Sequence, residues 1–168
     1  PEKIPKLRPA FKENGTVTAA NASSISDGAA ALALMLPSEA EAQGIKPIAL
    51  IHGYQQAAHE PEWFTTAPVA AIEKTLKQVG WTQSDVDLWE INEAFAVVVL
   101  AAMQDLGISH KQLNIHGGAC ALGHPIGASG ARIMVSLIHA LQQTGGKKGI
   151  ASLCIGGGEA TAVALELV

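Results

Sequence analysis

Strand-like and helix-like segments alternate along this chain from residue 48 to residue 168, and this order constrains the fold more than any other feature. Apolar residues at helical spacing predict helices over residues 68–79, 93–106 and 131–143, of which the first two end at Gly80 and Gly107. Apolar runs predict strands over residues 48–53, 86–91, 113–115, 149–155 and 161–168. The order β-α-β-α-β-α-β-β predicts an α/β fold with a mostly parallel five-stranded sheet, helices on both faces and an antiparallel pair of strands at its edge.

The first 46 residues differ from the rest of the chain. Residues 1–18 contain three prolines and the turn dipeptide Asn14-Gly15, which indicates a connecting arm. Small apolar residues at 29–36 predict a buried strand. Residues 38–44 predict a short helix, with Ser38 as its N-cap, Glu41 at the capping-box position and Gly44 at its end.

The composition excludes some classes of partner. Hydrophobic residues make up 48% of the chain and charged residues 15%, so we expect a larger assembly to cover much of the surface. The net charge of −4 argues against nucleic acid, since phosphate neutralisation requires clustered Lys and Arg. The longest apolar run, at residues 94–103, is too short to span a bilayer, and we expect no membrane association.

The two cysteines, Cys120 and Cys154, predict neither a disulfide framework nor a metal site, which favours the cytoplasm or another reducing soluble compartment. Cys154 ends an apolar run, where a buried thiol would ordinarily be inert. The glycines at 156–158 favour a functional interpretation, because they let a substrate approach closely and free backbone amides to bind an anion.

Two further polar residues lie in loops suited to catalysis. His124 is flanked by Gly123 and Pro125, which hold its imidazole in one place, although a structural loop histidine would look the same. Asn92 precedes a predicted helix and is otherwise explained as its N-cap. Cysteine, histidine and asparagine at strand ends and in loops are residue types that acyl transfer uses.

In type, order and spacing, three motifs resemble the second half of a thiolase: Asn92-Glu93-Ala94-Phe95, Gly123-His124-Pro125 and Cys154-Ile155-Gly156-Gly157-Gly158. The resemblance implies that residues 1–18 end an inserted loop region, residues 19–46 are the last elements of the N-terminal half, and residues 48–168 form the C-terminal domain. It also implies that the acyl-carrying cysteine lies in an N-terminal half not included here, and that the full-length protein is a homo-oligomer. The chain would then supply half of an active site.

The resemblance implies a role for each catalytic candidate. His124 would activate the acyl-carrying cysteine and donate to a thioester oxygen. Cys154 would shuttle the proton alpha to the thioester, which requires a thiol pKa lowered toward neutrality. Asn92 would orient a water that forms an oxyanion hole with His124, and the Gly156 amide would hold the oxygen of the bound acyl group.

Two residues are expected to bind substrate. Ser23 occupies the loop position that, in the family, hydrogen-bonds the pantetheine arm of coenzyme A. Phe95 would face the pantetheine channel or else the core. Glu93 would support the site, or else it is an acidic residue in the first turn of the helix that the helix dipole favours.

The expected function is that of an acyl-CoA C-acyltransferase, which condenses and thiolyses short-chain 3-ketoacyl-CoA through a covalent acyl-cysteine. Coenzyme A thioesters are its substrates, and no cofactor is expected. Two alternatives stay open: a ketoacyl-synthase-type condensing enzyme and a non-catalytic CoA- or lipid-binding module of the same fold. Cys154 argues against the first, because ketoacyl synthases carry His or Asn at that position, and the intact site residues argue against the second.

Overall fold

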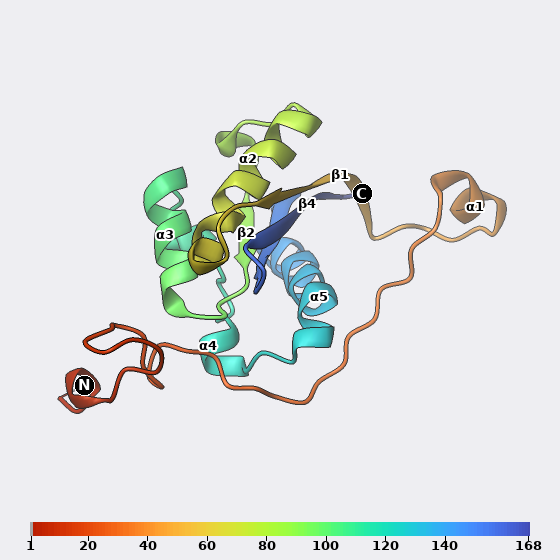
Figure 1. The fold of residues 1–168 in the computed structure, drawn as a ribbon. Helices are drawn as coiled ribbons and strands as arrows, with labels where there is room; N and C mark the ends of the chain where they lie inside the picture. The colour runs from red at the N-terminus through yellow and green to blue at the C-terminus, as the bar shows by residue number, and fades with distance from the viewer. Residues whose placement is uncertain (1) are drawn as a thin grey trace.

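The computed structural model describes residues 2–168, and these residues form one four-stranded sheet (Figure 1). Its strands are β1 (Ala49–Ala58), β2 (Leu88–Ile91), β3 (Lys148–Ile155) and β4 (Glu159–Leu167), in the order β1-β4-β3-β2. Only β2 and β3 run parallel, whereas β4 is antiparallel to both of its neighbours. The α/β class is confirmed, and the prediction of a mostly parallel five-stranded sheet is wrong.

The turn after β3 explains why the sheet is mixed. The glycines at 156–158 reverse the chain, so that β4 returns antiparallel to β3 with Glu159 opposite Ile155. β1 then pairs with the other side of β4, again antiparallel. The antiparallel pair of β3 and β4 therefore lies inside the sheet, and β1 and β2 form its two edges.

The predicted strand at residues 113–115 is reduced to a single bridge between Leu113 and Trp89. Asn114 takes the left-handed backbone conformation, with φ of 48°, which interrupts an extended chain. Its side-chain amide accepts a hydrogen bond from the Ile91 N–H (2.9 Å) and donates one to the Ile91 carbonyl (2.8 Å). A side chain thus takes the place of the fifth strand beside β2.

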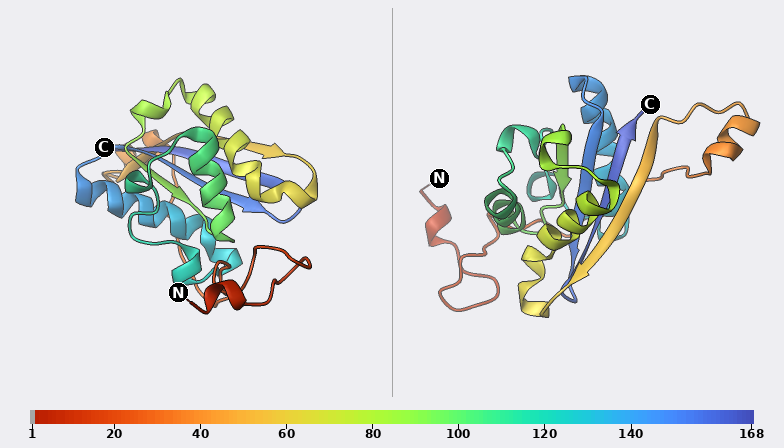
Figure 2. Two further views of the ribbon diagram at one scale, coloured as in Figure 1. Left: turned by 90° about the vertical axis from the view of Figure 1, so that its left-hand side faces the viewer. Right: turned by 90° about the horizontal axis from the view of Figure 1, so that it is seen from above.

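Helices cover both faces of the sheet, as the sequence predicted (Figure 2). α2 (Ala67–Val79) and α3 (Ala96–Leu106) pack on one face, and α5 (Ile126–Thr144) packs on the other. Successive side chains of a strand point to opposite faces, so Glu90 points to the α5 side of β2. The sheet residues beneath α2 and α3 include Trp89, Ile91, Ile150, Cys154, Ala160, Ala162 and Ala164, and those beneath α5 are Leu88, Ala151 and Leu165.

The helix ends follow local signals. α2 and α3 end as predicted, at Gly80 and Gly107, which adopt φ of 69° and 66°. α3 begins later than predicted, because Phe95 is extended and bridges to Ala22. α5 begins earlier than predicted, directly after Pro125, whose carbonyl accepts from the N–H groups of the first turn.

Residues 2–46 contain little regular structure. α1 (Pro37–Ala42) is preceded by Leu36 and has no side-chain cap, so the predicted roles of Ser38 and Glu41 are wrong. The described residues contain no strand at 29–36, and Leu34 and Leu36 are 71% and 68% exposed, because no sheet edge accompanies this segment. It runs away from the sheet and carries α1 apart from the body (Figure 1). The remaining short helices are α4 (Ala119–Leu122) and the 3-10 turns Ile4–Lys6, Pro61–Thr66, Gln83–Asp85 and His110–Gln112.

Candidate functional site

The candidate site lies at the carboxyl ends of the two parallel strands. Asn92 directly follows β2, and its backbone N–H donates to the Ser152 carbonyl of β3 (2.9 Å). Cys154 lies two residues beyond Ser152, near the end of β3. Because parallel strands end at the same edge of a sheet, these residues gather where α/β folds usually bind ligands.

His124 enters this edge from the loop before α5, and the segment around residues 22–28 fixes its position. Its N–H donates to the Ser24 carbonyl (2.9 Å), and Ile25 pairs with it in a parallel bridge. Gly123 has φ of 92°, and a Cβ at this position would collide with the Ser26 side chain. Because Gly123 has no Cβ, the backbone beside His124 packs closely against Ser24 and Ser26, and this contact fixes the position of the ring.

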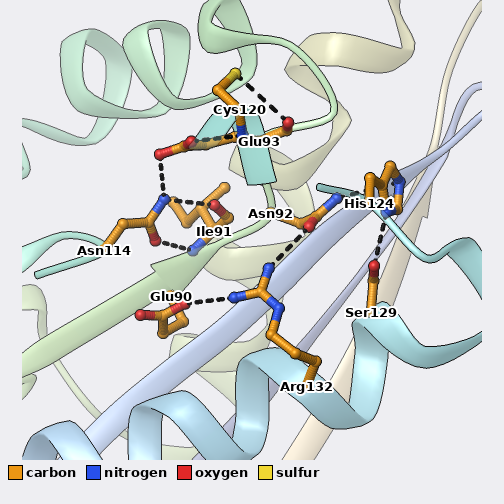
Figure 3. Close-up of polar contacts among 9 residues, drawn as sticks. All are labelled: Glu90, Ile91, Asn92, Glu93, Asn114, Cys120, His124, Ser129 and Arg132. Carbon is orange, nitrogen blue, oxygen red and sulfur yellow. Dashed lines mark hydrogen bonds and ion pairs between the residues drawn. The ribbon is translucent and has the colours of Figure 1, made fainter. Parts of the chain in front are cut away.

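A line of polar side chains runs through the site (Figure 3). His124 Nδ1 lies 2.6 Å from Ser129 Oγ, and His124 Nε2 lies 3.3 Å from Asn92 Nδ2. Arg132 Nη2 donates to Asn92 Oδ1 (3.2 Å), and Arg132 Nη1 lies 3.5 Å from Glu90 Oε2. The structure thus brings together two of the expected catalytic residues, His124 and Asn92.

Burial lowers the pKa of His124 below its ordinary value, and the charge of Arg132 lowers it further. Both causes disfavour the protonated ring. A neutral imidazole at neutral pH retains a lone pair, as a general base requires.

Glu90 is the only carboxylate within β2 and is 2% exposed. Its burial raises its pKa to about 7, with Arg132 opposing the rise and Glu93 adding to it. Burial of a carboxylate is costly without a partner, and Arg132 supplies the nearest opposite charge.

Changing Glu90 to glutamine in the full-length protein is expected to flatten the dependence of stability on pH. The folded pKa, about 7, lies above the ordinary value of 4.5, so the folded state holds a proton that the unfolded state has already lost. Stability from this group is complete below the unfolded pKa and declines as pH rises through the folded pKa, by at most about 3 kcal/mol. Melting temperatures at pH 5 and pH 8 measure the effect, with exposed Glu73→Gln on α2 as control. An equal pH dependence in wild type and Glu90→Gln would contradict it.

Cys154 is 7% exposed and packs in the core beneath α2 and α3. Burial raises the pKa of its thiol to about 11, and a backbone hydrogen bond opposes this only in part. The expected lowering of this pKa toward neutrality is therefore wrong for the surroundings that residues 2–168 provide. Among these residues no hydrogen bond joins the thiol to His124 or Asn92.

The glycines after Cys154 have different structural roles. Gly158 has φ of 102°, and a Cβ there would collide with the His59 carbonyl, so this glycine is needed to form the turn. A Cβ at Gly156 would meet no atom within 4 Å. The backbone at Gly156 is exposed and open to the approach of a ligand.

The two expected substrate-binding residues, Ser23 and Phe95, lie in two segments of the chain that contact each other. Ser23 Oγ donates to the Ala94 carbonyl (2.9 Å), and its backbone N–H donates to the same oxygen (3.0 Å). The ring of Phe95 makes edge contacts with Phe11 and Phe64, at centroid distances of 5.4 and 6.1 Å. The Ser23 hydroxyl thus retains only its acceptor capacity, and Phe95 is part of a small aromatic cluster.

Glu93 organises the loop that leads to His124. Its carboxylate accepts from Asn114 Nδ2 (2.9 Å) and from the Cys120 N–H (3.1 Å). Gly118 lies so close that a Cβ there would overlap this carboxylate. Of the two interpretations of Glu93, the structure favours support of the site.

Sequence reasoning missed Glu90, Ser129 as a partner of His124, and Arg132. A usable signal was present: Glu90 lies between Trp89 and Ile91 in an apolar strand, and alternation places it on the face opposite theirs. A buried carboxylate requires a cation, and Arg132 is the only Lys or Arg in α5.

Within residues 2–168 no cluster of three or more His, Cys, Asp or Glu side chains is placed to hold a metal ion. None of the helices they form has the length and apolar character needed to cross a membrane.

Comparison with known proteins reveals clear relatives. Residues 45–167 match the family model of the thiolase C-terminal domain, and residues 1–38 match that of the thiolase N-terminal domain. An acetyl-CoA acetyltransferase of Chromobacterium violaceum is 53% identical over 163 residues, which are 97% of this chain and 42% of that protein.

Solved structures agree. The crystal structure of an acetyl-CoA acetyltransferase from Bacillus anthracis matches with a TM-score of 0.95 at 47% identity, over 99% of this chain and 42% of the other. Human mitochondrial 3-ketoacyl-CoA thiolase in complex with CoA matches with a TM-score of 0.90 at 40% identity, over 99% and 42% of the two chains. The chain spans about 40% of the length of the curated relatives it matches.

Proposed function

The chain belongs to the thiolase family, and from this premise we propose that the full-length polypeptide containing it is an acyl-CoA C-acyltransferase. It condenses two acyl-CoA thioesters and, in reverse, thiolyses short-chain 3-ketoacyl-CoA. The observation that carries the proposal is the contact between His124 Nε2 and Asn92 Nδ2 (3.3 Å), at the sheet edge where β3 ends with Cys154.

In the first half-reaction, a cysteine outside this chain attacks the acyl-CoA thioester. His124 Nε2 accepts the proton of that thiol, and the departing coenzyme A sulfur receives it. The protonated Nε2 meanwhile donates to the thioester oxygen, and the amide of Asn92 orients a water toward the same region. Both contacts stabilise negative charge that develops on oxygen.

In the second half-reaction, the thiolate of Cys154 removes the proton alpha to a second thioester. The resulting carbanion attacks the acyl group, and the acyl-carrying cysteine leaves as a thiolate, which takes over the negative charge. The open backbone at Gly156 provides an amide donor for the acyl oxygen. A resting thiol, with its pKa raised to about 11, is the form needed in thiolysis, where Cys154 protonates the departing enolate.

The remaining assignments follow the same proposal. Ser23 contacts the pantetheine arm through its free acceptor capacity, and Phe95 borders the channel for that arm. Coenzyme A thioesters are the substrates, without a further cofactor. Residues 1–18 end the loop region, 19–46 are the last elements of the N-terminal half, and 48–168 form the C-terminal domain. The partners are the N-terminal half and further copies in a homo-oligomer, in the cytoplasm or another reducing compartment.

Activity of purified protein tests this function. Full-length protein is expected to thiolyse acetoacetyl-CoA, measured by the loss of its enolate absorbance, whereas residues 1–168 alone are expected to show no turnover because the acyl-carrying cysteine is absent. Robust turnover by residues 1–168 would overturn the half-site assignment. Full-length protein that binds coenzyme A without any turnover would instead favour a non-catalytic binding module.

A further inference from the structure

We propose that Arg132 is a positioning residue that, through the amide of Asn92, holds His124 in the tautomer with its proton on Nδ1 and its lone pair on Nε2. The inference deepens the proposed function, because it rests on His124 serving as a base. It concerns three contacts in one line, from Glu90 through Arg132 and Asn92 to His124 (Figure 3).

The direction of the first hydrogen bond is fixed by chemistry. A guanidinium group has only donors, so the atom of Asn92 that faces Arg132 Nη2 at 3.2 Å must be the amide oxygen. The amide nitrogen of Asn92 then faces His124 Nε2, 3.3 Å away. An amide NH2 group only donates, and Nε2 must therefore accept.

The other side of the ring leads to the same tautomer. Ser129 Oγ donates its hydrogen to the Pro125 carbonyl (3.1 Å). It can then only accept from His124 Nδ1, 2.6 Å away, which must carry the proton. Ser129 and Arg132 are three residues apart on α5 and therefore share one face of this helix. From that face Ser129 contacts His124, and Arg132 contacts Asn92.

Glu90 completes the arrangement as the acidic side chain beside Arg132. The Arg132 side chain is 19% exposed, and its Nη1 is buried without a hydrogen-bond partner among the described residues. The Glu90 carboxylate lies 3.5 Å from Nη1 and is the acidic group paired with it. The guanidinium of Arg132 is therefore held close to Asn92 by Glu90, which belongs to the sheet and not to α5.

Loss of Arg132 would free the Asn92 amide to turn over. Its oxygen would then accept a hydrogen bond from a protonated Nε2, and Nε2 would no longer carry the lone pair that a base requires. Lysine at this position is not equivalent, since a compact ammonium lacks the planar fork that reaches Asn92 and Glu90 together.

Kinetics of full-length variants provide the first test. Arg132→Ala and Arg132→Met are expected to lower kcat about 10- to 100-fold, with KM within about threefold of wild type, because the base is misoriented while substrate contacts remain. Millimolar methylguanidinium is expected to restore activity to Arg132→Ala but not to Arg132→Met, whose side chain fills the vacated space. Lys77→Met is the control, because it replaces an exposed cation of α2 that lies outside the site.

Nitrogen-15 NMR of histidine-labelled full-length protein provides a readout independent of turnover. The His124 signals, assigned by their absence from His124→Gln, should show an unprotonated Nε2 in wild type and a mixture of tautomers in Arg132→Met. A protonated Nε2 in neutral wild type, unchanged signals in the variant, or activity loss without rescue by methylguanidinium would overturn the inference. Inactive wild-type protein with the expected NMR change would refute the proposed function but leave the assignment of the tautomer, and of Arg132 as its cause, standing.

Discussion

Changing Cys154 to serine in the full-length protein is expected to slow carbon–carbon bond formation by about 10²- to 10⁴-fold, the usual contribution of a positioned acid–base group. A serine hydroxyl is a far weaker acid than a thiol, so it cannot exist as an anion near neutral pH. The burial that raises the pKa of Cys154 to about 11 would act on a serine hydroxyl in the same direction, because burial disfavours any anion. Acylation of the upstream cysteine should continue, since it does not use this proton.

Single-turnover labelling with radiolabelled acetyl-CoA separates the two steps, since label on the protein reports acylation and labelled acetoacetyl-CoA reports condensation. Cys120→Ser is the matched control, because the Cys120 sulfur donates to the backbone carbonyls of Asn21 (3.7 Å) and Glu93 (3.8 Å). If Cys154→Ser failed to acquire label, Cys154 would itself be the nucleophile, and the assigned roles would be wrong.

Removing the imidazole of His124 is expected to impair the earlier step. His124→Ala should lower the rate of acylation by about 10²-fold or more, because it removes both the base for the nucleophilic thiol and one donor to the thioester oxygen. The pre-steady-state burst of labelled acyl-enzyme measures this rate directly. The lowered pKa of His124 adds a second expectation: wild-type acylation should persist below the pH at which an ordinary histidine becomes protonated.

His139→Ala is the control for this experiment, because His139 lies on the exposed side of the same helix, α5. It should acylate at the wild-type rate. Normal acylation by His124→Ala, with loss only of condensation, would exchange the proposed roles of His124 and Cys154.

Local signals in the sequence predicted the elements well where one short segment contains the whole cause. The left-handed glycines at 80 and 107 end α2 and α3 as expected, because a residue without Cβ adopts positive φ at no cost. As predicted, helices lie on both faces of the sheet and the last two strands pair antiparallel. His124 and Asn92, proposed from separate motifs, lie within hydrogen-bond distance.

Predictions failed where an outcome depends on a distant partner. Residues 29–36 have a strand-like composition but no neighbouring strand among the described residues, and an isolated extended segment leaves its backbone unpaired. At residues 113–115 the side chain of Asn114 satisfies the backbone of Ile91 and so replaces a strand. The pKa of Cys154 rises because core packing removes the thiol from water, a consequence of burial that residue order alone does not reveal.

The sequence by itself determined the α/β class and the ends of α2 and α3 at Gly80 and Gly107, and it indicated His124 and Asn92, because periodicity, glycines and short motifs act over a few neighbouring positions. The tertiary structure alone decided the strand order, which follows from β1 pairing with β4 across more than a hundred residues. It also decided that Arg132 of α5 lies between Glu90 of β2 and Asn92, and that Ser129 of the same helix contacts His124. Such contacts arise only when a strand and a helix distant in sequence are packed together, which local pattern does not specify.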